Sequence, residues 1–316
     1  MRWVHPNRCP SCLENSMSSF RWTAITSIRA IVGVAFMLPD LAVAQSPTAA
    51  TQINPTNRVL IEYVAPKDPV LQRFHDLLRE RRALEKIQEI LSPFRLPEPL
   101  TIKATECGEV NSWYMRENFK PTVTICYEYL RRILEFLPNE TTPAGVTPGD
   151  ATVGQFVWAT LHEVGHAIFD ILDVPIFGHP EAAADNFATY TMLQFGRGQA
   201  RRLIGGAAWA WRAFLGEYQK NPVVRKRIAT FADVHGLPEE RFYNHLCLAF
   251  GADPVQFADV ADYLPPTRLG TCKFEYLTLL KAFHKQISPH IDQEMARRVF
   301  DTNWLPDPKA KSAPRK

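Results

Sequence analysis

The sequence predicts an α+β fold, in which a small mixed or antiparallel sheet is followed by a predominantly helical body. Segments with alternating and β-branched side chains recur between residues 58 and 126, which is the pattern of strands. After residue 150, apolar residues instead recur at the three- and four-residue spacing of helices. With 46% hydrophobic and 22% charged residues, the 316-residue chain has the composition of an ordinary globular protein.

Strands and helices alternate in the first half of the chain. The strands are expected at residues 58–64, 100–107, 110–114 and 121–126. A helix is predicted over 68–91, because apolar residues keep helical spacing there until Pro93. Another is predicted over 127–137. The turn-rich stretch 138–150 then separates this half from the helical body.

The helical body is expected to begin with a long helix. Asp150 or Thr152 is predicted to cap its N-terminus, and the helix should end near Leu172, before Pro175. Further helical segments, at least four, are predicted between residues 181 and 286. The sequence contains no internal repeat.

Residues 1–44 have the features of a secretory signal peptide. The apolar run Ala30–Leu38 is too short to span a membrane, which takes about 20 residues. Arg21 and Arg29 precede it and Ala42-Val43-Ala44 follows it, as signal peptidase substrates require. A retained membrane anchor is the alternative interpretation.

The limits of the mature chain follow from this assignment. Residues 1–16 are interpreted as an over-extended start, because Met17 is a more natural first residue. A flexible lead-in is expected at 45–56, a single domain at 57–305 and a disordered basic tail at 306–316. The mature protein is then periplasmic or extracellular, with no stable membrane span.

Charge and cysteine content agree with export. The net charge of +3 is small and spread along the chain, which argues against a nucleic-acid partner. Four cysteines lie outside the signal region, an even number that indicates two disulfides in an oxidising compartment. We favour Cys107–Cys126 and Cys247–Cys272, since each pair closes a local unit. Four buried free thiols are the alternative.

The motif His162-Glu163-Val164-Gly165-His166 is the main functional signal. On a helix, residues 162 and 166 lie one turn apart on the same face, so both imidazoles can bind one ion. Zinc suits two neutral imidazole nitrogens, and one zinc ion per chain is expected. Glu163 can then take a proton from water on the metal. The alternative is a buried helix with no metal, which would leave costly unpaired polar groups.

A third ligand is expected from the next helix. Downstream acids and histidines compete for this role, and Glu181 is preferred because it begins Glu181-Ala182-Ala183-Ala184-Asp185. The alanines allow close helix packing, and Glu181 and Asp185 share a helix face. Asp185 is predicted to accept the second ring N–H of one zinc histidine. A solvated acidic helix start is the simpler alternative for Glu181 alone.

H-E-x-x-H followed by E-x-x-x-D resembles the gluzincin zinc peptidases, which have a zincin-like fold. The wider pattern resembles a bacterial family of putative metallopeptidases of uncharacterised function. That pattern comprises the H-E-V-G-H helix, the following segment Glu181–Ala188, Leu246-Cys247 with Gly251–Pro254, and Cys272 with Glu275-Tyr276. The resemblance covers most of the mature chain.

The gluzincin resemblance implies two further elements. Asn111, Ser112 and Trp113 resemble the edge strand that pairs with an extended substrate, with Ser in place of Ala, although an ordinary hairpin fits these residues equally well. The resemblance also implies a Tyr or His that stabilises the oxyanion, for which His179 and Tyr190 both remain open.

The function predicted from these features is an exported zinc metallopeptidase that acts on a peptide or protein substrate. A catalytically inactive, zinc-stabilised binding or scaffold protein of the cell envelope is the alternative from another class. Hydrolysis of cell-wall peptide or another non-protein amide is a third possibility. The sequence gives no indication of oligomeric state.

Overall fold

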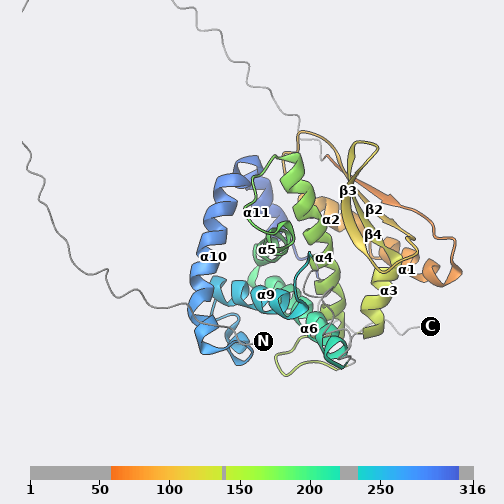
Figure 1. The fold of residues 1–316 in the computed structure, drawn as a ribbon. Coiled ribbons are helices and arrows are strands. Elements are labelled where there is room, and N and C mark those ends of the chain that lie inside the picture. The colour runs from red at the N-terminus through yellow and green to blue at the C-terminus, as the bar shows by residue number, and fades with distance from the viewer. Residues whose placement is uncertain (1–57, 137–139, 221–233, 306–316) are drawn as a thin grey trace, which may run out of the picture. The chain divides into compact units, whose positions relative to one another are not determined.

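The structure is a computed structural model that describes residues 58–136, 140–220 and 234–305. The predicted signal peptide with its over-extended start (1–16 within 1–44), the lead-in (45–56) and the basic tail (306–316) lie outside the described residues. Within the described ranges the fold is α+β, as predicted, with one small mixed sheet and a larger helical part (Figure 1).

The sheet has the strand order β1-β2-β4-β3. Its strands are β1 (Val59–Tyr63), β2 (Leu100–Thr105), β3 (Ser112–Glu117) and β4 (Lys120–Cys126). β1, β2 and β4 run parallel, while β3 pairs antiparallel with β4 and forms one edge. The connecting turn uses Asn118 and Phe119, both with positive φ (49° and 65°), as tight two-residue hairpins require. β3 therefore begins and ends later than the predicted strand over 110–114.

The predicted helix over 68–91 is in fact two helices, α1 (Pro69–Glu80) and α2 (Ala83–Leu91). The chain turns at Arg82, which has left-handed backbone angles (φ 51°). The break lets α2 pack against β1, where the Tyr63 hydroxyl accepts from the Leu84 N–H at 2.9 Å and donates to Glu85 at 2.7 Å. This tertiary contact overrides the continuous helical spacing.

A long central helix, α4 (Pro148–Ile171), follows α3 (Tyr127–Phe136). Its N-cap is Thr147, so the predicted caps Asp150 and Thr152 are wrong. Asp150 is instead the third helical residue of a capping box, in which the Thr147 side chain accepts from the Asp150 N–H and the Asp150 carboxylate accepts from the Thr147 N–H. α4 lies between the sheet on one side and α5 and α9 on the other, and it is buried along most of its length (Figure 1).

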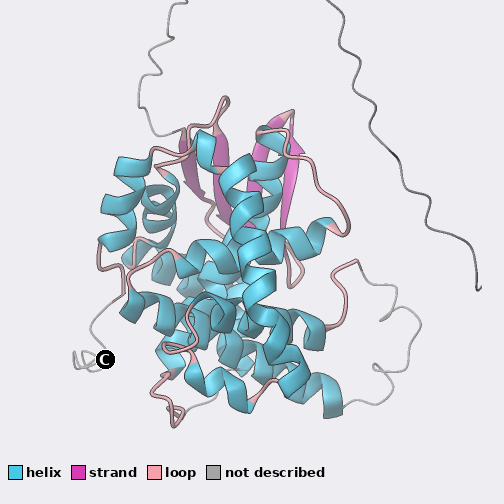
Figure 2. Cartoon of the chain, turned by 90° about the vertical axis from the view of Figure 1, so that its left-hand side faces the viewer, coloured by secondary structure: helices cyan, strands magenta, loops and turns pink. Residues whose placement is uncertain are grey.

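The helical part comprises α5 (Pro180–Leu193), α6 (Arg197–Lys220), α9 (Pro238–Ala252), α10 (Pro266–Gln286) and α11 (Gln293–Asp301). These helices gather on the side of α4 away from the strands, which lie at one end of the view in Figure 2. Short 3-10 turns occur at Ala258–Asp262 and Ser288–His290. Among the described residues, no helix combines the length and the apolar character needed to cross a bilayer.

Close helix contacts bring α5 and α6 onto α4. A Cβ on Gly154 would lie 2.5 Å from the Ala207 nitrogen, and one on Gly206 would lie 2.0 Å from the Asp150 carbonyl oxygen. The backbones of α4 and α6 therefore approach to a distance that only glycine permits. A disulfide between Cys247 and Cys272 joins α9 to α10, the pairing favoured from the sequence.

Candidate metal centre

Helix α4 carries the H-E-x-x-H residues in a buried position, with His162 only 3% and Glu163 only 8% exposed. His166 follows His162 by one helical turn. Gly165 lets α5 approach this turn, because a Cβ there would already lie 3.2 Å from the Ala184 Cα. The close contact brings the first turn of α5 to the two histidines.

Three donor atoms of His162, His166 and Glu181 converge. The two histidine Nε2 atoms are 3.3 Å apart, and Glu181 Oε2 lies 3.0 Å from His162 Nε2 and 3.4 Å from His166 Nε2. Ligands at the usual 2.0–2.1 Å from a tetrahedral zinc are separated by about 3.3–3.4 Å. The donor set and its spacing therefore fit one tetrahedral ion with three protein ligands.

A buried charge pair supports His162 from behind. Its Nδ1–H donates to Asp185 Oδ1 at 2.7 Å. Arg241 of α9 donates to both oxygens of the same carboxylate, at 2.7 and 2.8 Å, and its guanidinium lies 5.0 Å from the ring centres of Trp158 and Trp211. The hydrogen bond to Asp185 leaves His162 Nε2 as the atom that faces His166 and Glu181.

The start of β3 lies beside Glu163. The Ser112 hydroxyl donates to Glu163 Oε1 at 3.3 Å, and the Asn111 side-chain oxygen accepts from the Ser112 N–H at 2.9 Å. The Asn111 carbonyl accepts from the Cys126 N–H, so it is Ser112 and Tyr114 whose backbone groups point away from β4, toward the sheet edge. Trp113 pairs with β4 opposite Thr124.

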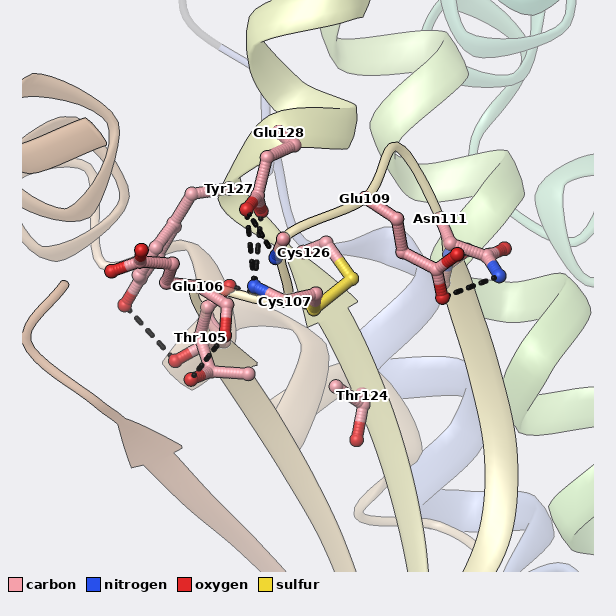
Figure 3. The surroundings of a disulfide bond; sticks show 12 residues. Thr105, Glu106, Cys107, Glu109, Asn111, Thr124, Cys126, Tyr127 and Glu128 are labelled. Atoms are coloured by element: carbon pink, nitrogen blue, oxygen red, sulfur yellow. Dashed lines mark hydrogen bonds between the residues drawn. A yellow bond between two sulfur atoms is a disulfide. The ribbon is translucent and has the colours of Figure 1, made fainter. Parts of the chain in front are cut away.

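The loop that leads into β3 is fixed at two points (Figure 3). A disulfide joins Cys107 to Cys126 at the end of β4, the pairing favoured from the sequence. The buried Glu128 carboxylate accepts from the Cys107 N–H and, at 2.7 Å, from the Gly108 N–H. These bonds hold Asn111 in place at the mouth of the site.

An open pocket of about 260 Å³ reaches His162, one of the three residues that supply these donor atoms. His162 and Glu163 form part of one wall, and Asn111 and Ser112 form part of another. Glu163, His162 and the start of β3 thus face the same open space.

A family model matches residues 63–287, which is more than half of the chain and includes every site residue named above. The chain belongs to the DUF4344 family of putative metallopeptidases. No curated protein and no solved structure matches it. Family membership implies a metal ion and peptide substrates, and the described residues contain groups able to hold such an ion around His162.

The charges in this DUF4344 member favour a cation among the donor atoms. Burial by itself lowers the pKa of His162, but hydrogen bonds to Asp185 and Glu181 outweigh burial and raise the pKa to about 9. Contacts with His162 and His166 hold the pKa of Glu181 well below its usual range. Burial raises the pKa of the Glu163 carboxyl. A divalent cation would supply the positive charge that the carboxylates of Glu163 and Glu181 attract.

The DUF4344 site also includes two residues that the sequence did not single out. His235, from the segment before α9, has its Nε2 3.3 Å from Glu181 Oε2 and its ring centre 6.4 Å from that of His162. Arg241 belongs to the next helix. Neither residue follows a local spacing pattern that connects it to the motif on α4, so only folding reveals the contact.

The two oxyanion candidates lie elsewhere. Tyr190 is on the opposite side of α5 from Glu181, with its ring 4.2 Å from that of Phe283, and lines a separate pocket. His179 is exposed at the N-cap position of α5 and does not line the pocket beside Glu163. The structure therefore brings neither of them into that pocket.

Proposed function

We propose that the chain is an exported zinc-dependent peptidase in which Glu163 is the general base. The supporting observation is the triangle of His162, His166 and Glu181 donor atoms, spaced as tetrahedral zinc requires, beside Glu163 in an open pocket. Two imidazole nitrogens and one carboxylate oxygen form a ligand set typical of catalytic zinc. Two disulfides are consistent with an oxidising, extracytoplasmic compartment.

Each of these side chains then has one task. His162, His166 and Glu181 would hold the zinc, and Asp185 would keep the His162 ring in the required tautomer. When bound, the zinc would polarise the scissile carbonyl and make a water molecule more acidic. Glu163 takes a proton from the attacking water and returns it to the departing amine. The burial that raises its pKa makes it a better proton acceptor at neutral pH.

The edge strand and His235 complete the proposal. An extended substrate would pair with the outward backbone groups of Ser112 and Tyr114, as in strand addition to a sheet edge. His235 is half exposed and reaches toward the ligand triangle. We assign it the oxyanion-stabilising role that neither Tyr190 nor His179 can fill from their positions outside the pocket.

The test is Glu163→Gln, with Glu80→Gln on the exposed end of α1 as the control. Metal content of the purified proteins and hydrolysis of a peptide pool are measured together. We expect one zinc per chain in all three proteins, and loss of hydrolysis by at least about 100-fold only in Glu163→Gln. Full activity of Glu163→Gln, or wild-type protein without stoichiometric metal, would contradict the proposal.

One observation favours a second candidate function. His235 Nε2 is close enough to Glu181 and His162 to act as a fourth ligand. Four protein ligands would make a closed, structural zinc site, and the protein would then be an inactive, zinc-stabilised scaffold of the cell envelope. His235→Ala separates the two functions. Loss of zinc affinity indicates a fourth ligand, whereas retained zinc with reduced hydrolysis indicates an oxyanion donor.

A further inference from the structure

The pocket beside Glu163 extends well beyond the ligand triangle. Besides His162 and Glu163, α4 contributes Trp158 to its lining, α6 contributes Trp211, and the loop before β3 contributes Val110. The space thus begins at the general base and continues between α4 and α6. If a peptide bond of the substrate is held at Glu163, the side chain of a neighbouring substrate residue would point into this space.

The far wall of the pocket is aromatic. Trp158 and Trp211 meet edge to face with ring centres 5.2 Å apart, and Phe214 lies 6.2 Å from Trp211. Tyr129 of α3 also lines the space, and its hydroxyl accepts from the Gln155 side-chain amide at 2.9 Å. Trp158 and Trp211 are only 3% and 8% exposed, so the wall is rigid, and the part of it that the pocket exposes offers apolar contact to another ring.

The lining of the pocket holds more cationic than anionic side chains. Among its described lining residues, Glu163 is the only carboxylate. Arg241 is neutralised by Asp185, whereas the half-exposed Arg132 has only a long contact of 3.9 Å to a carboxylate, that of Glu135, and lies over the Phe136 ring at 3.4 Å. A cationic substrate side chain would therefore lose hydration and meet a like charge, with Glu163, the proposed general base, as the one carboxylate of the described lining.

We infer that this pocket is the specificity subsite for a bulky apolar side chain, preferably aromatic, on the substrate residue next to the scissile bond. Arg132 makes the same subsite reject Lys and Arg. This inference rests on the proposed peptidase function and names the class of peptide that the site takes. Selectivity for an aromatic residue over alanine should be at least about tenfold, since one methylene in an apolar pocket is already worth about 10-fold or more.

Binding to the zinc-loaded Glu163→Gln chain tests this inference apart from catalysis. The probes are blocked, glycine-rich heptapeptides that differ only at the central residue, which is Phe, Leu, Ala, Asp or Lys. Calorimetry, and the intrinsic tryptophan fluorescence to which Trp158 and Trp211 contribute, measure the dissociation constants with and without zinc. We expect Phe to bind at least tenfold more tightly than Ala, with Leu between them and Lys the weakest.

Two substitutions assign the preference to this pocket. Val110 is 49% exposed, so Val110→Asp places a charge at the mouth with little risk to folding, and it should remove most of the Phe preference. Arg132→Glu should make the Lys peptide bind better than the Asp peptide. Leu134→Asp, on the same helix as Arg132 but outside the pocket lining and 40% exposed, is the matched control and should change neither preference.

The results separate this inference from the proposed function. Equal binding of the Phe and Ala peptides, or a Phe preference that survives Val110→Asp, overturns the subsite. Wild-type protein that cleaves peptides without regard to the flanking residue also overturns it but leaves the peptidase function intact. Selective binding of the Phe peptide by a protein that cleaves no peptide supports the subsite and contradicts the peptidase.

Discussion

Arg241 gives the sharpest test of how the metal centre is built. Its side chain is only 14% exposed, makes two short hydrogen bonds to Asp185 and contacts two tryptophan rings. Arg241→Leu leaves the buried Asp185 carboxylate with protonated His162 as its one remaining charged partner among the described residues. Loss of one partner of a buried ion pair costs about 3–5 kcal/mol. Asp185 keeps the His162 N–H, so we expect the lower end, about 3 kcal/mol.

The assay is urea and thermal unfolding of metal-free protein, with zinc affinity measured separately by chelator competition. For a domain of this size the loss corresponds to a fall in melting temperature of about 6–12 °C. Zinc affinity should fall about 10- to 100-fold, because the His162 ring is held less firmly when Asp185 can shift. A purely structural role for Arg241 would lower stability but leave the zinc affinity of the folded protein unchanged.

Two controls make the result interpretable. Arg298→Leu removes an equally short ion pair, 2.6 Å to Glu294, from the exposed face of α11, and should cost less than about 1 kcal/mol. In the double variant Arg241→Leu/Asp185→Asn no charge is left unpaired, and it should be more stable than the sum of the single effects implies. The reasoning is refuted if Arg241→Leu costs no more than Arg298→Leu, or if the double variant is additive.

Other predictions follow from the same structure. Zinc must replace a proton on His162, because the pKa of this residue in the metal-free protein is about 9. The apparent zinc affinity should therefore rise by up to tenfold per pH unit from pH 6 to about 9. Zinc titrations that show no such rise would contradict this expectation. The same raised pKa stabilises the metal-free fold below pH about 6.5, and that stabilisation should disappear as the pH passes about 9 in unfolding experiments. Gly154→Ala should lower the free energy of unfolding, measured in urea, by about 1–3 kcal/mol, because α6 leaves no room for a Cβ at this position. Gly198→Ala is the control, and it should be neutral or slightly stabilising because the space around Gly198 is open. Replacement of both Cys247 and Cys272 by alanine should cost about 3–4 kcal/mol, measured against the reduced and oxidised wild-type protein.

The sequence by itself determined the features that depend on short spacings. Strand and helix periodicity was enough for the α+β class, since burial of one face imposes the repeat on the sequence. The donor groups of His162 and His166, and of Glu181 and Asp185, are each separated by four residues, which a helix places on one face whatever the surrounding fold. The start of α4 is also encoded locally, because Thr147 and Asp150 have the spacing of a capping box. This signature makes Thr147 a better N-cap than Asp150 or Thr152.

The tertiary structure decided what depends on contacts between distant segments. Only packing on β1 breaks the helix at Arg82, since the residues on both sides keep helical spacing. His235 and Arg241 come from beyond α6, and Tyr190 faces away from the site although it is close to Glu181 in the chain. Helix packing sets which faces meet, and a single residue carries no signal of the partner that a distant helix will bring to it.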